Sequence, residues 1–166
     1  MSFGGQSQQR WGDNTIHSGE FIRDLQLTDL AGRVCHTGPA RGKGALVLAF
    51  FEPTDPASVA LLAHLQALAD GYKEGGKLTI FALSQGGDAA TRTAADESGA
   101  TFPVLLDHGG YHAGLYGLGA FPTLYLVRAD GSVMVKGKNG SSKVLQAISD
   151  GVAKIAGVEP VLLSAA

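Results

Sequence analysis

The hydrophobic pattern of the chain is dominated by two continuous apolar runs, at 46–51 and 78–83. Runs of this length predict strands that are buried on both faces of a sheet. Apolar residues recur at helical spacing over 56–72, between the two runs, which predicts an amphipathic helix. A strand, a helix and a second strand form a βαβ unit. The two strands are therefore predicted to be parallel, with a right-handed crossover.

Weaker patterns on both sides extend this unit. Alternation over 21–27 predicts a half-buried strand, and 33–37 is its return strand in an N-terminal hairpin. The remainder is predicted as helices over 88–98 (with Asp88 as N-cap), 111–116 and 142–156, and strands over 102–106, 121–127 and 132–136. We expect an α/β fold with a central mixed sheet flanked by helices. One domain covers 19–157, with a flexible arm at 1–18 and a tail at 158–166.

Composition narrows the functional classes. The 166 residues carry a net charge of −2, so there is no electrostatic case for binding nucleic acid or an anionic membrane. Cys35 is the only cysteine, which excludes an intrachain disulfide. The polar start of the chain lacks the pattern of a signal peptide, so a cytoplasmic location is expected. Neither a cofactor nor a metal site is expected. His108 and His112 have a helical chelating spacing, but two glycines intervene.

The junction between the first apolar strand and its helix is the best candidate for a functional site. The strand ends at Phe51, and after a short turn the chain reads Asp55-Pro56-Ala57-Ser58. Asp55 is a suitable N-cap, because its carboxylate can accept from free N–H groups of the first helical turn. Pro56 suits the first helical position, where no donor is needed. The α/β proteins place their chemistry at such strand ends.

The segment LVLAFFEPTDPASVALLAHLQAL, at 46–68, resembles the active-site segment of the thioredoxin-like superfamily, in its redoxin branch. That branch includes thiol-disulfide oxidoreductases and peroxiredoxins of the AhpC/TSA type. A Cys-x-x-Cys or Thr-x-x-Cys motif opens the helix in those proteins, whereas Asp55 and Ser58 occupy the two outer positions here. The resemblance implies a thioredoxin-like fold with an N-terminal β-hairpin, a redoxin-type insertion and a degenerate active site.

The segment YGLGAFPTLYLVRADGSV, at 116–133, resembles the cis-proline region of the same family. The resemblance implies that Pro122 is cis and lies against 55–58. The alternative is a trans proline that begins an edge strand. On the family pattern, a groove would bind a partner protein or an extended peptide. Its expected lining residues are Phe51, Thr54, Asp55, Pro56, Ser58, Phe121, Pro122 and Thr123.

Loss of sulfur decides what the motif can do. Thiol-disulfide exchange needs an attacking thiolate and a second thiol, and neither Asp55 nor Ser58 supplies one. His64 is predicted on another face of the helix, so Ser58 has no base. The leading hypothesis is a redox-inactive module for binding proteins or peptides. Asp55 either caps the helix alone or also presents a fixed charge to the bound segment.

Two other functions remain open. Cys35 lies between Arg33 and His36, whose positive charge could lower its pKa. The protein would then be an atypical thiol oxidoreductase or an antioxidant peroxidase that uses Cys35. A small, buried, apolar cysteine is the alternative. The apolar tail VEPVLLSAA also makes a homodimer an expectation, which light scattering can test.

Overall fold

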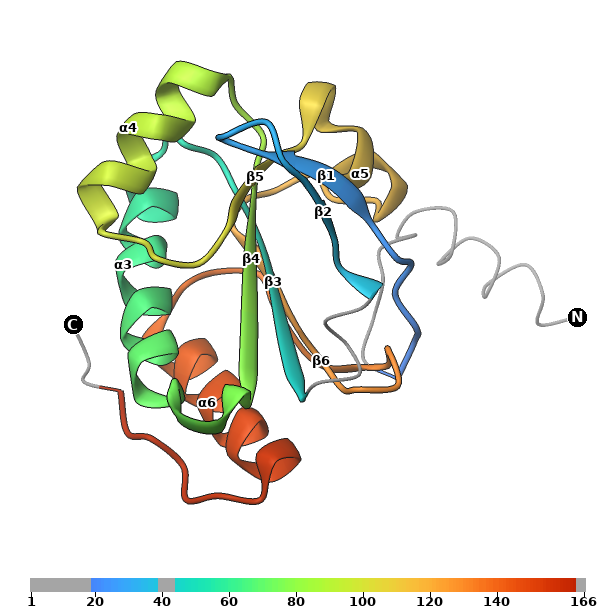
Figure 1. The fold of residues 1–166 in the computed structure, drawn as a ribbon, viewed down its shortest axis with the longest axis vertical. Coiled ribbons are helices and arrows are strands. Elements are labelled where there is room, and N and C mark those ends of the chain that lie inside the picture. The colour runs from blue at the N-terminus through green and yellow to red at the C-terminus, as the bar shows by residue number, and fades with distance from the viewer. Residues whose placement is uncertain (1–18, 39–43, 164–166) are drawn as a thin grey trace, which may run out of the picture.

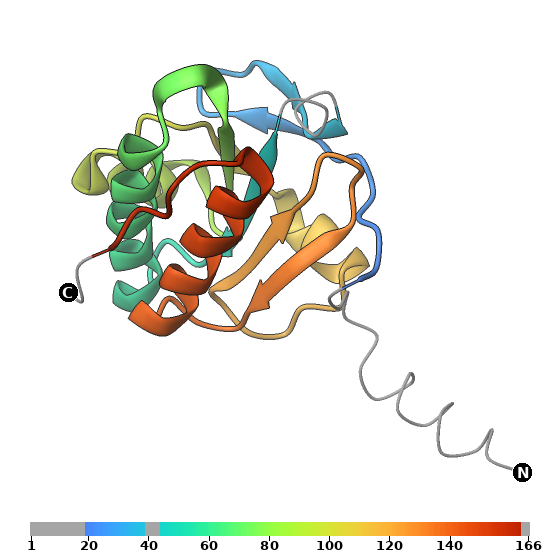
Figure 2. The same cartoon turned by 90° about the horizontal axis from the view of Figure 1, so that it is seen from below.

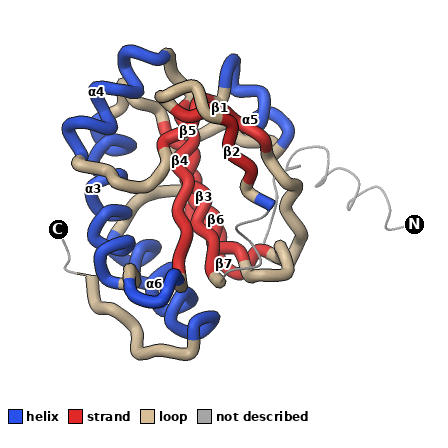
Figure 3. The backbone as a smooth tube through the Cα atoms, in the orientation of Figure 1, coloured by secondary structure: helices blue, strands red, loops and turns tan. Residues whose placement is uncertain are grey.

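The computed structural model describes residues 19–38 and 44–163, and these form one mixed sheet with helices on both faces (Figures 1 and 3). The predicted arm at 1–18 lies outside the described residues. The strand order in the sheet is β2-β1-β5-β4-β3-β6-β7. The strands are β1 (Gln26–Asp29), β2 (Val34–His36), β3 (Ala45–Phe51), β4 (Leu78–Ser84), β5 (Val104–Leu106), β6 (Thr123–Val127) and β7 (Val133–Gly137). The helices are α3 (Pro56–Gly71), α4 (Asp88–Ser98), α5 (Tyr111–Leu115) and α6 (Ser142–Ala156), with short 3₁₀ turns η1 (Glu74–Gly76) and η2 (His108–Gly110).

The parallel centre of the sheet follows the predicted βαβ unit. Strand β3 pairs in parallel with β4, and β4 with β5, whereas β6 runs antiparallel to β3. Helices α3, α4 and α6 cover one face of the sheet, and α5 lies on the other (Figures 1 and 2). All seven residues of β3 are buried, because the strand lies between β4 and β6 and has a helical layer on each face.

Side chains of β3 alternate between two cores. Ala45, Val47, Ala49 and Phe51 belong to the core beneath α3 and α6. Leu46, Leu48 and Phe50 belong to the core on the other face, with Tyr116 and Tyr125. The aromatic rings of that second core pack closely, with 5.2 Å between the centroids of Phe50 and Tyr116. The continuous apolar run at 46–51 thus fills both sides of the sheet.

Helix prediction was the most accurate part of the element assignment. Helix α6 covers the predicted 142–156, and α3 and α4 differ from their predicted ranges by at most one residue. One helix-terminal prediction is wrong. The N-cap of α4 is Gly87, and Asp88 is the first helical residue, where its side chain accepts from Arg92 Nε.

The N-terminal hairpin is present but displaced. The predicted strand at 21–27 is wrong in its position, since β1 covers Gln26–Asp29 and Phe21 forms only an isolated bridge to Ser132. Ile22 and Leu25 are nevertheless buried in the second core. Leu25 and Leu27 are buried as the alternation predicts, whereas Phe21 is 65% exposed, and the backbone pairs with β5 only at Thr28 and Asp29.

The C-terminal segment 158–163 crosses from the end of α6 to α3 (Figure 2). The Tyr72 hydroxyl accepts from Val161 N at 2.8 Å. Ser149 Oγ donates to Val161 O at 2.6 Å, and Gln146 Oε1 accepts from Leu163 N at 3.0 Å. A Cβ at Gly71 would lie 2.9 Å from Val161 Cγ1, so this glycine lets the segment lie close to α3.

This packing explains part of the apolar character of the tail. Val161 and Leu163 pack against the core that contains α3 and α6. Leu162 is 84% exposed. The homodimer expected from the tail stays a prediction. Within 19–38 and 44–163, no helix combines the length and the apolar character needed to cross a bilayer.

Candidate functional site

The candidate site lies at the end of the sheet formed by the carboxyl ends of the parallel strands β3, β4 and β5. We call this end the sheet edge, as distinct from the edge strands β2 and β7. Phe50 of β3 pairs with Thr123 of β6, so the turn that follows β3 and the loop that precedes β6 leave neighbouring strands at the same edge. The segment after β4 joins them, because Gln85 N donates to Phe51 O at 2.9 Å. Topology therefore brings 52–58, 85–87 and 121–122 to one end of the molecule, the upper end in Figure 1.

The start of α3 has the predicted cap. Asp55 has extended backbone angles (φ −95°, ψ 119°), and its Oδ1 accepts from Ala57 N at 3.4 Å. Pro56 is the first helical residue, and Val59 N donates to the Asp55 carbonyl at 3.0 Å. The Asp55 side chain is half-buried, so its carboxylate caps the helix and also reaches the surface.

The Phe121–Pro122 peptide bond is cis, the isomer that the family resemblance implies. Thr123 Oγ1 donates to the carbonyl of Ala120 at 2.9 Å, which closes the loop before β6. Pro122 and Thr123 are buried, and Phe121 is half-buried against the second core.

The predicted lining residues divide into two layers. Thr54 and Pro56 are exposed, and Asp55 and Phe121 are half-buried, so these four can contact a bound segment. Phe51 is fully buried in the core beneath α3, which contradicts its predicted place in the lining. The reason is the central position of β3, whose last residue is covered by the helix that follows. Buried residues that support the surface from beneath are Ser58, Pro122 and Thr123.

Ser58 carries an unpaired buried hydroxyl. Its side chain is 0% exposed, and its Oγ has no hydrogen-bond partner among the residues that the structure describes. No histidine or carboxylate in the described chain bonds to this oxygen, so nothing activates it as a nucleophile. Sequence reasoning identified Ser58 as a lining residue but missed its complete burial.

Two carboxylates give the edge a negative charge. Glu52 is half-buried, and its Oε1 accepts from Thr54 Oγ1 at 3.0 Å. Neither Glu52 nor Asp55 forms an ion pair in the described part of the chain, where Arg33 pairs with Asp29 and Arg92 pairs with Asp88. Hydrogen bonds to Thr54 and to the Ala57 N–H are therefore the described partners of these two carboxylates, and no described cation pairs with either.

Cys35 lies on β2, far along the sheet from this edge, and is not part of the candidate site. Its side chain is half-buried and packs against the second core. Partial burial raises the pKa of the thiol, the Asp29 carboxylate raises that pKa further, and the Arg33 guanidinium lowers it. The net direction is opposite to the activation that the neighbouring basic residues suggested.

His108 and His112, the pair with helical chelating spacing, lie in η2 and α5 and not at the start of α3. Asp107 is 1% exposed, and its carboxylate accepts from His112 N at 2.8 Å and Ala113 N at 2.9 Å, so it holds the start of α5. Across 19–38 and 44–163, no group of three His, Cys, Asp or Glu side chains is arranged to hold a metal ion.

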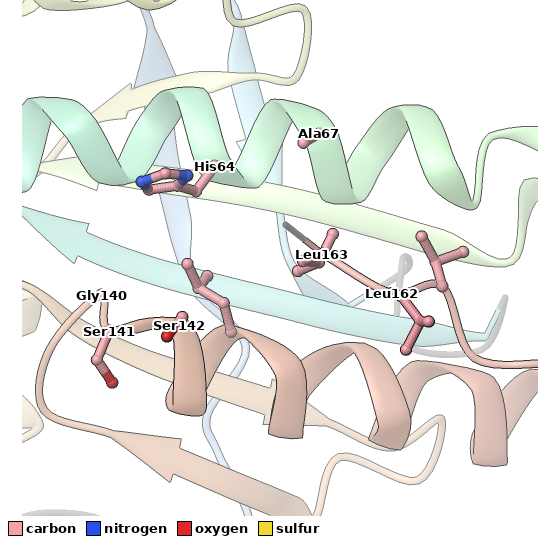
Figure 4. Close-up of a pocket in the computed structure, with 9 residues that line it drawn as sticks. His64, Ala67, Gly140, Ser141, Ser142, Leu162 and Leu163 are labelled. Carbon is pink, nitrogen blue, oxygen red and sulfur yellow. The ribbon is translucent and has the colours of Figure 1, made fainter. Parts of the chain in front are cut away.

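His64 lines a hollow of about 330 Å³ between α3 and α6, together with Ser141, Ser142 and Leu163 (Figure 4). Its imidazole therefore lies away from Ser58, as the helical spacing predicts. Neither Asp55 nor Pro122 lines this hollow. Sequence reasoning did not foresee it, because its walls come from helix surfaces and the C-terminal segment.

Comparison with known proteins supports the family resemblance. The chain is 31% identical over 116 residues to a thiol-disulfide oxidoreductase, ResA, from Bacillus thuringiensis. The matched region covers 70% of this chain and 66% of that protein. A ResA from Oceanobacillus iheyensis is 29% identical over 126 residues, with 73% of this chain and 65% of the relative covered. The chain thus spans slightly less than two thirds of the length of these relatives. No family model matches the chain.

Solved structures show the same fold. The thioredoxin domain of a thiol-disulfide oxidoreductase from Bacteroides vulgatus has a TM-score of 0.73 at 16% identity, covering 83% of this chain and 99% of that one. Peroxidoxin BcpB from Mycobacterium tuberculosis has a TM-score of 0.70 at 18% identity, covering 86% and 97%. The solved structures share the fold, and the sequence similarity shows that the chain belongs to the thioredoxin-like redoxin superfamily.

Proposed function

We propose that this domain binds an extended segment of a partner protein at the sheet edge between the start of α3 and Pro122, without dithiol catalysis. The observation that carries the proposal is that the backbone elements of the family's active site are present while its thiols are absent. The α3 cap and the cis-proline loop are in place on neighbouring strands. The helix-opening positions where relatives of this branch carry sulfur hold Asp55 and Ser58.

The chemistry of the two side chains supports a binding role. A carboxylate cannot form the mixed disulfide through which thiol exchange proceeds. The Ser58 hydroxyl is buried and has no described base beside it. Exposed side chains and a helix N-terminus remain at the surface, and these can orient a bound backbone.

Cys35 does not offer a better-supported catalytic alternative. It lies on β2, separated from β3 by three strands in the sheet order. Its thiol pKa is raised, so less of the nucleophilic thiolate is present at neutral pH than for an ordinary cysteine. Thiol chemistry at Cys35 would also leave the cis-proline loop at Pro122 without a part in the reaction.

The first test is catalytic. We expect the wild-type protein to show no reduction of insulin and no thiol-dependent turnover of hydrogen peroxide. The matched control is Cys35→Ser, which should behave as the wild type does. Substantial activity that persists in Cys35→Ser would refute the proposal, because no other sulfur nucleophile of the cysteine type exists in the chain.

The second test introduces the two missing thiols. Asp55→Cys combined with Ser58→Cys should create a dithiol that forms a disulfide and cycles with dithiothreitol, because the two positions are those of the family motif. Mass spectrometry after thiol alkylation reports the disulfide. The single variant Asp55→Cys is the control, since it lacks the second thiol at 58. A double variant that stays reduced under mild oxidation would show that the motif is wrongly placed.

A further inference from the structure

We propose that the sheet edge selects peptide segments that carry Lys or Arg beside a bulky apolar residue. The proposal concerns the acidic–apolar surface, which we define as Glu52, Asp55, Tyr111, Leu115 and Phe121. It rests on the proposed function, because it names the chemistry of the segment that the same edge would bind. The selectivity itself follows from the charge and exposure of these five residues.

Contacts along the edge connect the acidic part of this surface to the apolar part. A Cβ at Gly86 would meet Pro53, which places the chain after β4 directly against the turn after β3. A Cβ at Gly110 would lie 3.2 Å from Gln85 Oε1, which places the start of α5 against the same chain. The turn after β3, the segment after β4 and the start of α5 therefore lie side by side at this end of the sheet.

The apolar part is an uncovered helix face. Tyr111 is 64% exposed and Leu115 is 42% exposed, and residues four apart on a helix lie on the same face. Leu118 N donates to Ala113 O at 2.9 Å, which closes the end of α5, and Phe121 follows three residues later, half-buried against the second core. A bulky apolar side chain of a peptide could bury itself against this face, and the same burial would cover two exposed apolar residues.

No cationic side chain of residues 19–38 and 44–163 pairs with the acidic part. Arg92 Nε lies 2.6 Å from Asp88 Oδ1, and its guanidinium also donates to the Leu30 carbonyl. Arg33 is held by Asp29. Because Glu52 and Asp55 have no ion-pair partner among the described residues, a basic side chain is the complement that the edge lacks. Like charges would instead repel, which gives selectivity against acidic segments.

The test is a titration of the full chain with three end-blocked hexapeptides, GKLFKG, GQLFQG and GELFEG, followed by backbone amide NMR shifts. We expect shifts at 52–58 and 111–122, with GKLFKG binding about fivefold more tightly than GQLFQG and GELFEG more weakly than both. The preference should shrink in high salt, because exposed charges are screened.

Two pairs of variants make the test specific. Glu52→Gln with Asp55→Asn keeps the side-chain shapes and a helix cap, and should make the three affinities nearly equal. Asp96→Asn with Glu97→Gln changes the net charge equally on exposed positions of α4, and should leave the preference intact. Tyr111→Gln with Leu115→Gln should weaken all three peptides, whereas Val34→Thr on the exposed edge strand β2 should not.

The outcomes distinguish the basic–apolar selectivity from the peptide-binding function on which it rests. Equal affinities of the wild type for the three peptides, with shifts at the sheet edge, would overturn the basic–apolar selectivity and leave the peptide-binding function standing. An order that survives Glu52→Gln with Asp55→Asn would also overturn the inference, since the charge would then act elsewhere. The absence of shifts at 52–58 and 111–122 with every peptide would overturn both.

Discussion

At the scale of one residue, Ser58 places a polar group inside the packing of the candidate site. The side chain is fully buried at the first turn of α3, and its hydroxyl has no described hydrogen-bond partner. Leaving a buried hydroxyl unpaired costs about 1–3 kcal/mol. The unpaired hydroxyl therefore lowers the free energy of unfolding, whereas an apolar group of similar size would not.

Replacement of this hydroxyl should be favourable. Ser58→Ala is expected to raise the free energy of unfolding by about 1 kcal/mol, because it removes an unpaired donor and adds helix propensity. Urea unfolding measures the change. The matched control is Ser149→Ala in α6, where the hydroxyl bonds to Tyr72 and Val161, and that variant should lose about 1–2 kcal/mol. Equal losses in the two variants would mean that Ser58 Oγ is satisfied after all.

Individual residues were predictable where the cause is local. The cap at Asp55 and the first-turn proline follow from sequence neighbours, and both are present. The burial of Phe51 was not predictable in the same way, because it depends on β4, β6 and α3 meeting around it. The environment of Cys35 also depends on a distant contribution, the burial that raises the pKa of its thiol.

At the scale of an element, the turn between β1 and β2 is organised by one carboxylate. Asp29 Oδ1 accepts from Ala31 N at 2.9 Å and from Arg33 N at 2.8 Å, and Oδ2 accepts from Arg33 Nε at 2.9 Å. The backbone N–H of Arg33 is the largest cause that lowers the pKa of Asp29, burial opposes it, and Ala31 and the guanidinium lower it further. The charged carboxylate is thus the form that holds this turn together.

A pH dependence follows from that direction. Because the folded-state pKa is below the unfolded value of about 3.9, the Asp29 contribution is complete above that value and is lost as the pH falls through the folded-state pKa. Asp29→Asn should therefore lower the urea midpoint at pH 7, and its difference from the wild type should shrink below pH 4. A difference that stays constant from pH 7 to pH 2.5 would contradict this assignment.

Elements with a strong periodicity of apolar residues were predictable, whereas elements whose bounds depend on pairing with other strands were not. Helix α6 carries Leu145, Ile148 and Val152 on one face and begins at the Ser141 cap, so its range follows from sequence alone. Strand β1 begins five residues later than predicted, because pairing with β2 and β5, rather than alternation, sets where a strand begins. The start of α3 at the candidate site was predictable for the first reason, since a capped helix begins there.

At the scale of the whole molecule, hydrogen bonds of Tyr72 hold α3, α6 and the C-terminal segment together. The hydroxyl of Tyr72, at the end of α3, donates to the Ser149 carbonyl at 2.8 Å and accepts from Val161 N at 2.8 Å. One side chain thereby links α3, α6 and the C-terminal segment. No sequence pattern indicates this link, because none of the three groups is near another along the chain.

Removal of that one oxygen should loosen the closure. Tyr72→Phe is expected to lower the free energy of unfolding by about 1–2 kcal/mol and to speed amide hydrogen exchange at Val161, since the donor loses its acceptor. Tyr111→Phe is the matched control, because its ring is 64% exposed and the variant should match the wild type. Unchanged exchange at Val161 in Tyr72→Phe would show that other contacts hold the segment.

The hydrogen bond between Tyr72 and Val161 joins residues that are 89 positions apart. During synthesis from the N-terminus, α3 is therefore complete long before its last partner exists. The groove between α3 and α6 stays open on the nascent chain until the segment that contains Val161 has been synthesised. A product truncated before Val161 therefore lacks this closure.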